Sequence, residues 1–101
     1  MAKPNRLLYD PQAYRDLEEI FDYIRTESVD RAASVLELLD RRVMRLIGFP
    51  LLGVVPKDPR LQKKGYRVLV VEDYLIFYVL KRRVVRIRRV IHGARQYKFL
   101  L

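Results

Sequence analysis

The spacing of the apolar residues changes from helical to extended partway along this chain. Between residues 13 and 47 large apolar side chains recur every three or four positions, which is the period of a helix with one buried face. Between residues 66 and 92 β-branched and aromatic residues dominate and are separated by short charged turns. This order predicts a helix layer packed on an antiparallel sheet, because each layer needs the other to cover its apolar face.

Two amphipathic helices are expected in the first half. The first begins at Asp10-Pro11, where Asp can accept free amide protons of the first turn and Pro is tolerated at the first helical position. Its apolar stripe consists of Ala13, Leu17, Ile20, Phe21 and Ile24. Its expected water-facing residues are Arg15, Asp16, Glu18, Glu19 and Asp22. The second helix begins at Ser28 or Asp30 and ends at Gly48. Since only a few residues separate the helices, they should form an antiparallel hairpin.

Short strands are expected on both sides of this hairpin. Residues 6–9 form a short apolar run suited to an edge strand, and residues 49–62 contain three Pro and one Gly without a sustained period, which predicts an irregular loop. Strands are predicted at 66–71, 74–80 and 84–92, joined by turns at 72–73 and 81–83. The sequence therefore predicts one α+β domain over residues 1–101, with an N-terminal strand and a helical hairpin packed on an antiparallel β-meander.

One arginine conflicts with the pattern of the last strand. Val85, Ile87, Arg89 and Ile91 alternate onto the face that should be buried. Either the guanidinium of Arg89 reaches an edge of the sheet, or a β-bulge shifts the register of the strand. The sequence leaves both possibilities open.

Positive charge is concentrated in the second half. Residues 1–50 hold eight Lys or Arg against nine Asp or Glu, whereas residues 51–101 hold thirteen against three. From Lys81 to the last residue there are eight basic side chains and no acid, a density that repels itself unless an anion lies nearby. A polyanion or an acidic protein is the expected partner, and a basic surface that only keeps the domain soluble is the alternative.

Composition argues against several other kinds of site. The chain has no cysteine, which excludes disulfides, thiolate metal sites and a thiol nucleophile. Neither a metal-ligand spacing nor a Gly-rich phosphate loop occurs, so no metal and no cofactor is expected. No stretch approaches the roughly 20 apolar residues of a membrane span. A cytoplasmic protein without a membrane partner is therefore expected.

Four segments carry a more specific signal. They are FPLLGVVP at 49–56, GYRVLVV at 65–71, YLIFYV at 74–79 and RVIHGAR at 89–95. In this order and spacing they resemble the successive signatures of the RelE/ParE toxins of type II toxin–antitoxin systems, which include plasmid stabilisation proteins. The resemblance covers the chain from Arg6 to Leu101. It implies a cytoplasmic toxin that is neutralised by a cognate antitoxin, whose disordered segment folds onto it.

The family that the chain resembles has two activities. RelE-like members cleave messenger RNA in the ribosome, and ParE-like members inhibit DNA gyrase. One arginine of the RelE-like enzymes is matched by Arg95, but the other is replaced by Leu75, and their C-terminal aromatic residue is matched only approximately by Tyr97. These departures favour a ParE-like inhibitor that is not an enzyme, with Arg95, His92 and the basic last strand at its contact surface. The alternatives are a metal-independent, ribosome-dependent mRNA endoribonuclease and a nontoxic basic RNA-binding domain.

The endoribonuclease alternative has three candidate catalytic residues. Arg95 would stabilise the charged phosphorane, and His92 or Tyr97 would transfer a proton. For His92, a histidine that only hydrogen-bonds the backbone is the favoured interpretation. For Arg95, a salt bridge to the acidic first helix is about as compatible with the sequence as phosphate contact.

Six cations are candidates for contact with the target or with nucleic acid: Arg60, Lys63, Lys64, Arg67, Arg86 and Arg88. The first four cluster at the junction of loop and strand, where the family resemblance places substrate-facing positions, although a solvated loop would look the same. Tyr66, Tyr74 and Tyr78 could stack on bases. A place in the core, with the hydroxyl in contact with water, is favoured for these tyrosines.

Overall fold

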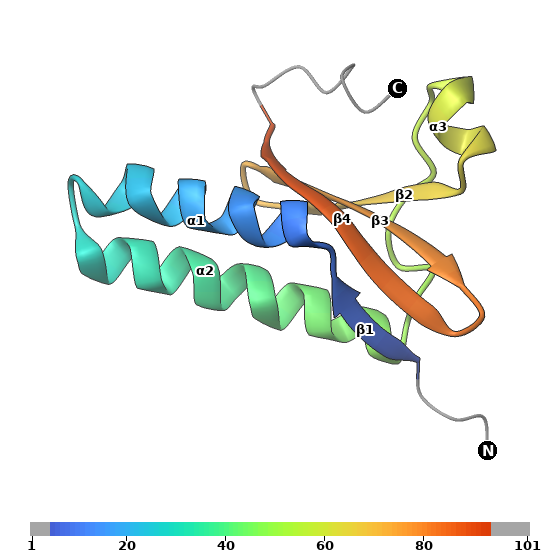
Figure 1. Ribbon diagram of the computed structural model, residues 1–101, viewed down its shortest axis with the longest axis horizontal. Coiled ribbons are helices and arrows are strands. Elements are labelled where there is room, and N and C mark those ends of the chain that lie inside the picture. Colours follow the sequence, from blue (N-terminus) through green and yellow to red (C-terminus); the bar gives the residue numbers. More distant parts are fainter. Residues whose placement is uncertain (1–4, 94–101) are drawn as a thin grey trace.

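The structure is a computed structural model that describes residues 5–93. Helices α1 (Pro11–Arg25) and α2 (Val29–Met44) lie side by side as a hairpin against a four-stranded sheet (Figure 1). The strands are β1 (Arg6–Tyr9), β2 (Tyr66–Val71), β3 (Tyr74–Lys81) and β4 (Val84–His92). A 3-10 turn, η1 (Arg45–Ile47), continues α2, and a short helix, α3 (Pro59–Lys63), precedes β2. The predicted α+β fold is confirmed, and no helix in residues 5–93 is long and apolar enough to cross a membrane.

The sheet has the strand order β1-β4-β3-β2. Strands β2, β3 and β4 form the predicted antiparallel meander, and β1 pairs in parallel with β4 so that Arg6 lies opposite Val84 and Tyr9 opposite Ile87. The sequence predicted β1 as an edge strand without naming its neighbour. The parallel pairing matters for the site, because it places the end of β1 and the start of α1 beside the basic strand β4.

The two helix starts differ in how they are capped. The Ser28 hydroxyl accepts a hydrogen bond from the backbone N–H of Arg31 at 3.1 Å, which confirms one of the two predicted starts of α2. Asp10 stands at the N-cap position of α1, but its side chain makes no capping hydrogen bond. The prediction that Asp10 caps the first turn is therefore wrong, and its carboxylate instead contacts arginines of β4.

Apolar side chains cover both faces of the sheet. The helix-side core joins the hairpin to the sheet, and its buried members include Ala13, Leu39, Val43, Leu46, Ile76, Tyr78, Val85, Ile87 and Val90. A smaller outer cluster lies on the opposite face and consists of Leu61, Tyr66, Val68, Phe77 and Ile91. The outer cluster shows that the sheet is covered in part by the segment between α2 and β2.

That segment corrects one prediction. Residues 49–62 were expected to form an irregular loop, yet α3 occupies Pro59–Lys63. The Asp58 side chain accepts a hydrogen bond from the backbone N–H of Arg60 at 2.8 Å, and Pro59 stands at the first helical position. Leu61 is fully buried and is the contact that fixes the helix. A five-residue helix with one buried side chain is too short to produce a detectable period in the sequence.

A buried tyrosine, Tyr78, and a partly buried one, Tyr9, predict a loss of stability at alkaline pH. Burial raises the pKa of Tyr9 and of Tyr78, and the charge of Asp40, which accepts a hydrogen bond from the Tyr9 hydroxyl at 3.1 Å, raises the pKa of Tyr9 further. Above pH 10 the unfolded chain loses these protons before the folded chain does. The free energy of unfolding should therefore fall as pH rises, by up to about 1.4 kcal/mol per pH unit for each tyrosine.

Urea unfolding measured between pH 9 and pH 11.5 tests this expectation. The Tyr9→Phe variant should show a shallower decline than the parent chain, because it lacks one of the tyrosines whose pKa is raised in the folded chain. Parallel declines in the two proteins would show that Tyr9 makes no contribution.

Candidate target-binding surface

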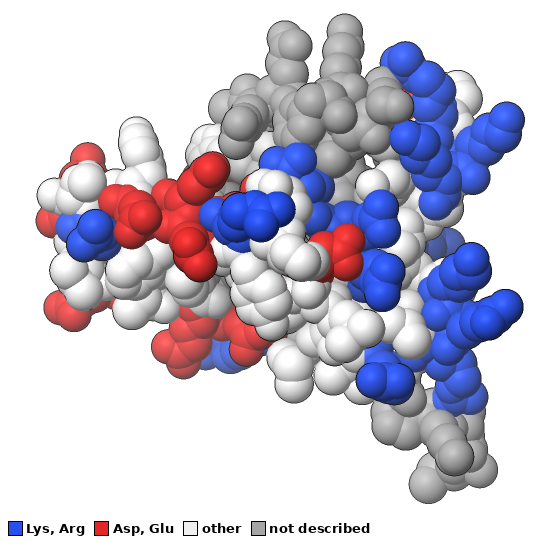
Figure 2. Space-filling view, in the orientation of Figure 1, with Lys and Arg blue, Asp and Glu red and all other residues white. Residues whose placement is uncertain are grey.

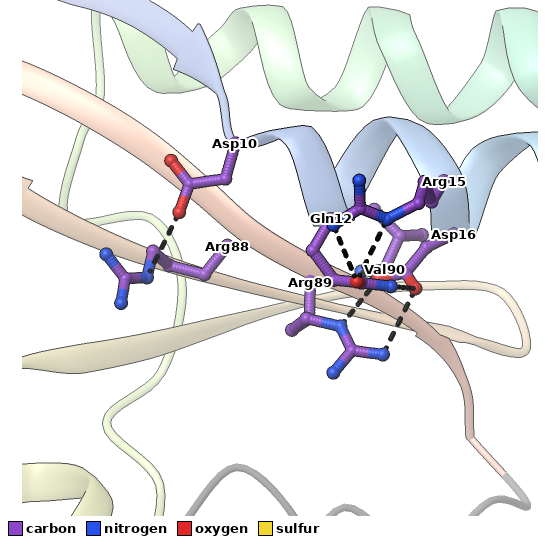
Figure 3. Close-up of polar contacts among 7 residues, drawn as sticks. All are labelled: Asp10, Gln12, Arg15, Asp16, Arg88, Arg89 and Val90. Atoms are coloured by element: carbon purple, nitrogen blue, oxygen red, sulfur yellow. Dashed lines mark hydrogen bonds and ion pairs between the residues drawn. The ribbon is translucent and has the colours of Figure 1, made fainter.

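A β-bulge in β4 determines where its arginines lie. Phe77 of β3 lies opposite Arg89 and Tyr78 lies opposite Ile87, so Arg88 is an extra residue in β4. Ile87 before the bulge and Val90 after it both pack into the helix-side core. Arg89 is thereby removed from the helix-facing side, and its guanidinium binds the carboxylate of Asp16 in α1 (Figure 3). The structure therefore contains both features that the sequence left open, namely a β-bulge and an Arg89 guanidinium that reaches the edge of the sheet.

Cations line an open groove of about 500 Å³ near the β3–β4 turn. We call it the hairpin groove, and it is lined by Leu8, Val79, Lys81, Arg82, Val84, Arg86 and Arg88. It lies on the outer face, since Val85 and Ile87, which alternate with these β4 residues, belong to the helix-side core. The structure thus brings together two of the six predicted cations, Arg86 and Arg88. Lys81 and Arg82, which were not among the six, line the same groove.

One carboxylate partly balances the charge of the hairpin groove. The carboxylate of Asp10 lies 3.3 Å from Nε of Arg88 (Figure 3) and 3.4 Å from Nε of Arg86. The side chains of Arg86 and Arg88 are 48% and 41% exposed. Ion pairs this exposed contribute about 1 kcal/mol or less, so Asp10 orients the guanidinium groups more than it stabilises the fold. Within residues 5–93, Lys81, Arg82 and Arg83 form no ion pair. The hairpin groove therefore keeps an excess of positive charge.

A second group of predicted cations lies on α3. Arg60 forms an ion pair with Asp58 at 3.3 Å, and the hydrogen bonds from the Arg60 side chain and backbone lower the pKa of the Asp58 carboxyl. Lys63 and Lys64 are exposed at the end of the same helix. Figure 2 shows Lys and Arg gathered over α3 and over the β3–β4 turn, on the side of the molecule away from the acidic part of the helical hairpin.

Arg67 is near these lysines in sequence but has a different environment. Its Nη1 donates hydrogen bonds to the carbonyl oxygens of Gly53 at 2.8 Å and Leu51 at 3.4 Å. The residue opposite Arg67 is Tyr78, which belongs to the helix-side core, whereas Lys63 and Lys64 lie on α3 above the outer cluster. Arg67 thus holds the loop between η1 and α3, and the six predicted cations do not form one continuous surface.

The end of β4 borders a hollow of about 430 Å³. It is lined by Asp16, Glu19, Ile20, Tyr23, Tyr74, Val90 and His92. The rings of His92 and Tyr74 meet edge to face, with their centroids 5.4 Å apart. The fold brings His92 near two carboxylates, which the sequence did not show, but Asp16 already accepts hydrogen bonds from Arg89, Gln12 and the Val90 backbone. Among residues 5–93, no cluster of three or more potential metal ligands occurs. Arg95 and Tyr97 lie outside the described residues.

The tyrosines are placed mainly as core residues. Tyr78 is completely buried, and its hydroxyl accepts a hydrogen bond from the Gly53 N–H at 2.9 Å and donates one to the Pro50 carbonyl at 2.8 Å. Tyr66 is 7% exposed and packs edge to face against Phe77. Neither ring is available to stack on a base, so the favoured prediction of a core role is confirmed for these two residues. The expected contact of the hydroxyl with water is wrong for Tyr78, because its hydroxyl is buried and bonded to Gly53 and Pro50.

Comparison with known proteins identifies the family. The sequence model described as the ParE toxin of the type II toxin–antitoxin system parDE matches residues 7–97. The chain belongs to the ParE toxin family. No curated protein sequence matches it.

Solved structures support the fold of this ParE-family toxin. The chromosomal ParDE toxin–antitoxin system from P. aeruginosa contains a chain with a TM-score of 0.74 and 20% identity, over 90% of this chain and 98% of that one. A mutant form of YafQ from E. coli has a TM-score of 0.54 and 22% identity, over 89% of this chain and 94% of that one. At such identities the likeness establishes the fold alone.

One sheet position separates this ParE-family chain from the RelE-like enzymes that it resembles. Leu75, where the resemblance would require an arginine, is partly buried and packs against the outer cluster. The space beside it is therefore apolar, and the cations of the outer face lie elsewhere, in the hairpin groove and on α3.

The sequence did not single out Asp10, Lys81 and Arg82 as members of the surface. The role of Asp10 depends on the parallel pairing of β1 with β4, which no local pattern reveals. Lys81 and Arg82 were assigned to a turn and counted in the basic stretch, but they were not named as contact residues. A signal was present, since three consecutive cations at the tip of a short hairpin repel one another.

Proposed function

We propose that this chain is the toxin of a type II toxin–antitoxin module, acting in the cytoplasm, that inhibits growth by binding DNA gyrase without catalysing a reaction. Residues 1–101 would act as one toxin domain, neutralised by a cognate antitoxin. The family match over residues 7–97 supports the toxin assignment. The observation that carries the choice of gyrase over the ribosome is Leu75, because it leaves an apolar side chain where a ribonuclease of this type needs a cation.

The chemistry of RNA cleavage explains the weight given to Leu75. A metal-free ribonuclease needs a base for the 2′-hydroxyl, an acid for the leaving oxygen and cations for the charged phosphorane. Near His92, both oxygens of the Asp16 carboxylate already accept hydrogen bonds, four in all, from Gln12, Arg89 and the Val90 backbone. A binding role makes fewer demands, since it needs only a complementary surface.

The proposed target surface combines the cations of the hairpin groove, including Arg86 and Arg88, with Arg60, Lys63 and Lys64 of α3 and with His92 and Arg95. A formal net charge of +9 favours rapid association with an anionic partner. The antitoxin is proposed to supply an acidic or amphipathic segment across the helical hairpin and a sheet edge, as a disordered chain can cover a large area of a small domain. Exposed Met44, Phe49 and Leu52 border a shallow hollow at η1 and would gain from such a cover.

Two assays separate the proposed function from its alternatives. Purified toxin should inhibit DNA supercoiling by gyrase and should leave ribosome-bound messenger RNA intact. Cleavage of that RNA without an effect on supercoiling would instead establish the endoribonuclease. Unchanged bacterial growth after induced expression would favour a nontoxic RNA-binding domain.

The Arg95→Glu variant should inhibit gyrase less strongly, because it replaces a positive charge of the proposed target surface with a negative one. We expect about tenfold more protein to be needed for half-inhibition of supercoiling, and normal growth of the expressing cells, with antitoxin binding unchanged. Arg25→Glu is the matched control, because Arg25 is exposed at the end of α1, and it should retain full toxicity. Undiminished toxicity of Arg95→Glu would place the working surface elsewhere.

A further inference from the structure

The chemistry of the hairpin groove points to a particular ligand. We propose that this groove binds the sugar–phosphate backbone of duplex DNA, so that the toxin contacts the DNA on which its target acts. This inference rests on the proposed function and adds Arg83, at the tip of the β3–β4 turn beside the groove, to the working residues. It assigns the groove to DNA and not to a protein segment.

The side chains of the groove suit phosphate. Arg82, Arg86 and Arg88 line it together with Lys81, and a guanidinium offers a planar fork of donors that matches two phosphate oxygens. Asp10 is the one acid in ion-pair contact with these groove cations within residues 5–93. Its carboxylate holds Arg86 and Arg88 while leaving about half of each side chain exposed. The groove thus presents several oriented cations with little internal compensation.

The backbone of the β3–β4 turn gives an independent argument. Arg82 and Arg83 have φ angles of 51° and 66°, the left-handed values of a type I′ hairpin turn. Asn-Gly is the favoured pair for this turn, since most other side chains are strained there. Arginines at these two positions make the turn less stable than Asn-Gly would, but they place two positive charges at an exposed tip. Strain held at a surface position is typical of residues that serve a function.

The floor of the groove discriminates between possible occupants. Leu8, Val79 and Val84 are aliphatic, and among residues 5–93 no aromatic ring lines the groove. Single-stranded nucleic acid binds largely by stacking its bases on aromatic rings, whereas a duplex keeps its bases inside and is held through its phosphates. An acidic peptide would fill the groove but leave the α3 cations unmatched. A duplex is long enough to meet both groups, which lie along one side of the molecule (Figure 2).

Binding of the full chain to a short DNA duplex, without gyrase, tests the inference by fluorescence anisotropy across a range of salt concentrations. The Lys81→Gln/Arg82→Gln variant should raise Kd about tenfold and should reduce the slope of log K against log salt by about 1.8, or roughly 0.9 for each lost contact. The control, Arg31→Gln/Arg41→Gln, removes two exposed cations from α2 and should change neither value appreciably.

A second variant removes the cations while favouring the turn. Arg82→Asn/Arg83→Gly should raise Tm, because it supplies the preferred residues of a type I′ turn, and should weaken DNA binding about tenfold. Loss of binding in a more stable protein cannot be attributed to misfolding. Unchanged DNA affinity in this variant would overturn the inference.

Other results would also reject it. The first is an absence of DNA binding by the parent chain at 50 mM salt, and the second is an equal loss of DNA affinity in the α2 control variant. The third is tighter binding of the parent chain to duplex RNA than to duplex DNA. The fourth is a groove variant that binds DNA-free gyrase more weakly but binds DNA as the parent chain does. The inference and the proposed function fail separately. Inhibited supercoiling without groove-dependent DNA binding rejects only the inference, and groove-dependent DNA binding with uninhibited supercoiling rejects only the gyrase target.

Discussion

The Asp16→Ala variant is expected to lower the free energy of unfolding by about 3–5 kcal/mol. Asp16 is 4% exposed, and its Oδ2 accepts hydrogen bonds from Nε of Arg89 at 2.8 Å and from the Val90 N–H at 2.9 Å (Figure 3). Its Oδ1 accepts further bonds from Arg89 and Gln12, both at 3.1 Å. Removal of this carboxylate takes two hydrogen bonds and a negative charge from a largely buried guanidinium and the acceptor from a buried backbone amide. This loss is far more costly than loss of a surface pair.

Urea unfolding at pH 7 measures this effect, and Asp22→Ala on the same helix is the matched control. Asp22 pairs with Arg25 at 3.0 Å, but the two side chains are 65% and 57% exposed, so the loss should be about 0.5 kcal/mol or less. Equal losses in the two variants would contradict the role assigned to Asp16. The milder Asp16→Asn variant, which retains one acceptor oxygen, should fall between them.

The contact of Asp16 with Arg89 also has a consequence for the surface. β1 pairs with β4 only as far as Ile87, and beyond that residue α1 lies beside the strand and Asp16 takes up the Val90 amide. This attachment stabilises β4 directly after the bulge at Arg88. The buried pair therefore helps to fix the register that places Arg86 and Arg88 in the hairpin groove.

The elements that the sequence predicted well are those whose signals are local. The helical hairpin follows from apolar residues repeated every three or four positions, and the N-cap at Ser28 from a single side chain. The three strands of the meander follow from β-branched runs separated by two charged turns, and their bounds differ from the predicted ones only at Lys81.

The features that were missed depend on contacts between distant residues. Asp16 was expected to face water, but it is buried because Arg89, 73 positions away, binds its carboxylate. A weak signal existed, since Asp16 stands three residues after Ala13 and four before Ile20, at the margin of the buried stripe. The bulge at Arg88 and the partner of β1 are likewise set by tertiary packing.

The candidate surface shows the same division. Arg86 and Arg88 could be proposed from charge and alternation alone, and they do lie together. Arg67 was grouped with Lys63 and Lys64 because they are neighbours in sequence, yet the turn between α3 and β2 separates them, and Arg67 binds loop carbonyls. Charge density identified the basic half of the chain. Only the fold shows that its cations lie in separate places, some in the hairpin groove, some on α3, and one, Arg67, bound to loop carbonyls.

The Gly53→Ala variant should destabilise the protein by about 3 kcal/mol, near the upper end of the usual cost of overpacking. A Cβ at Gly53 would lie 2.7 Å from both the Cε1 and the hydroxyl oxygen of Tyr78, and 2.9 Å from the Val68 carbonyl oxygen. Tyr78 cannot retreat easily, because it is completely buried and its hydroxyl is bonded to Gly53 and Pro50. The Val68 carbonyl is held by its bond to the Val54 amide at 2.9 Å.

Gly48→Ala is the control, since an added Cβ there meets no atom within 4 Å and the backbone has an ordinary φ of −91°. Its free energy of unfolding should stay within about 0.5 kcal/mol of the parent value or rise slightly, as alanine restricts the unfolded chain. The Gly53→Ala/Tyr78→Phe double variant should lose less than the sum of the two single losses, because the hydroxyl that clashes is gone. Strict additivity in urea unfolding would show that the cost of Gly53→Ala arises away from Tyr78.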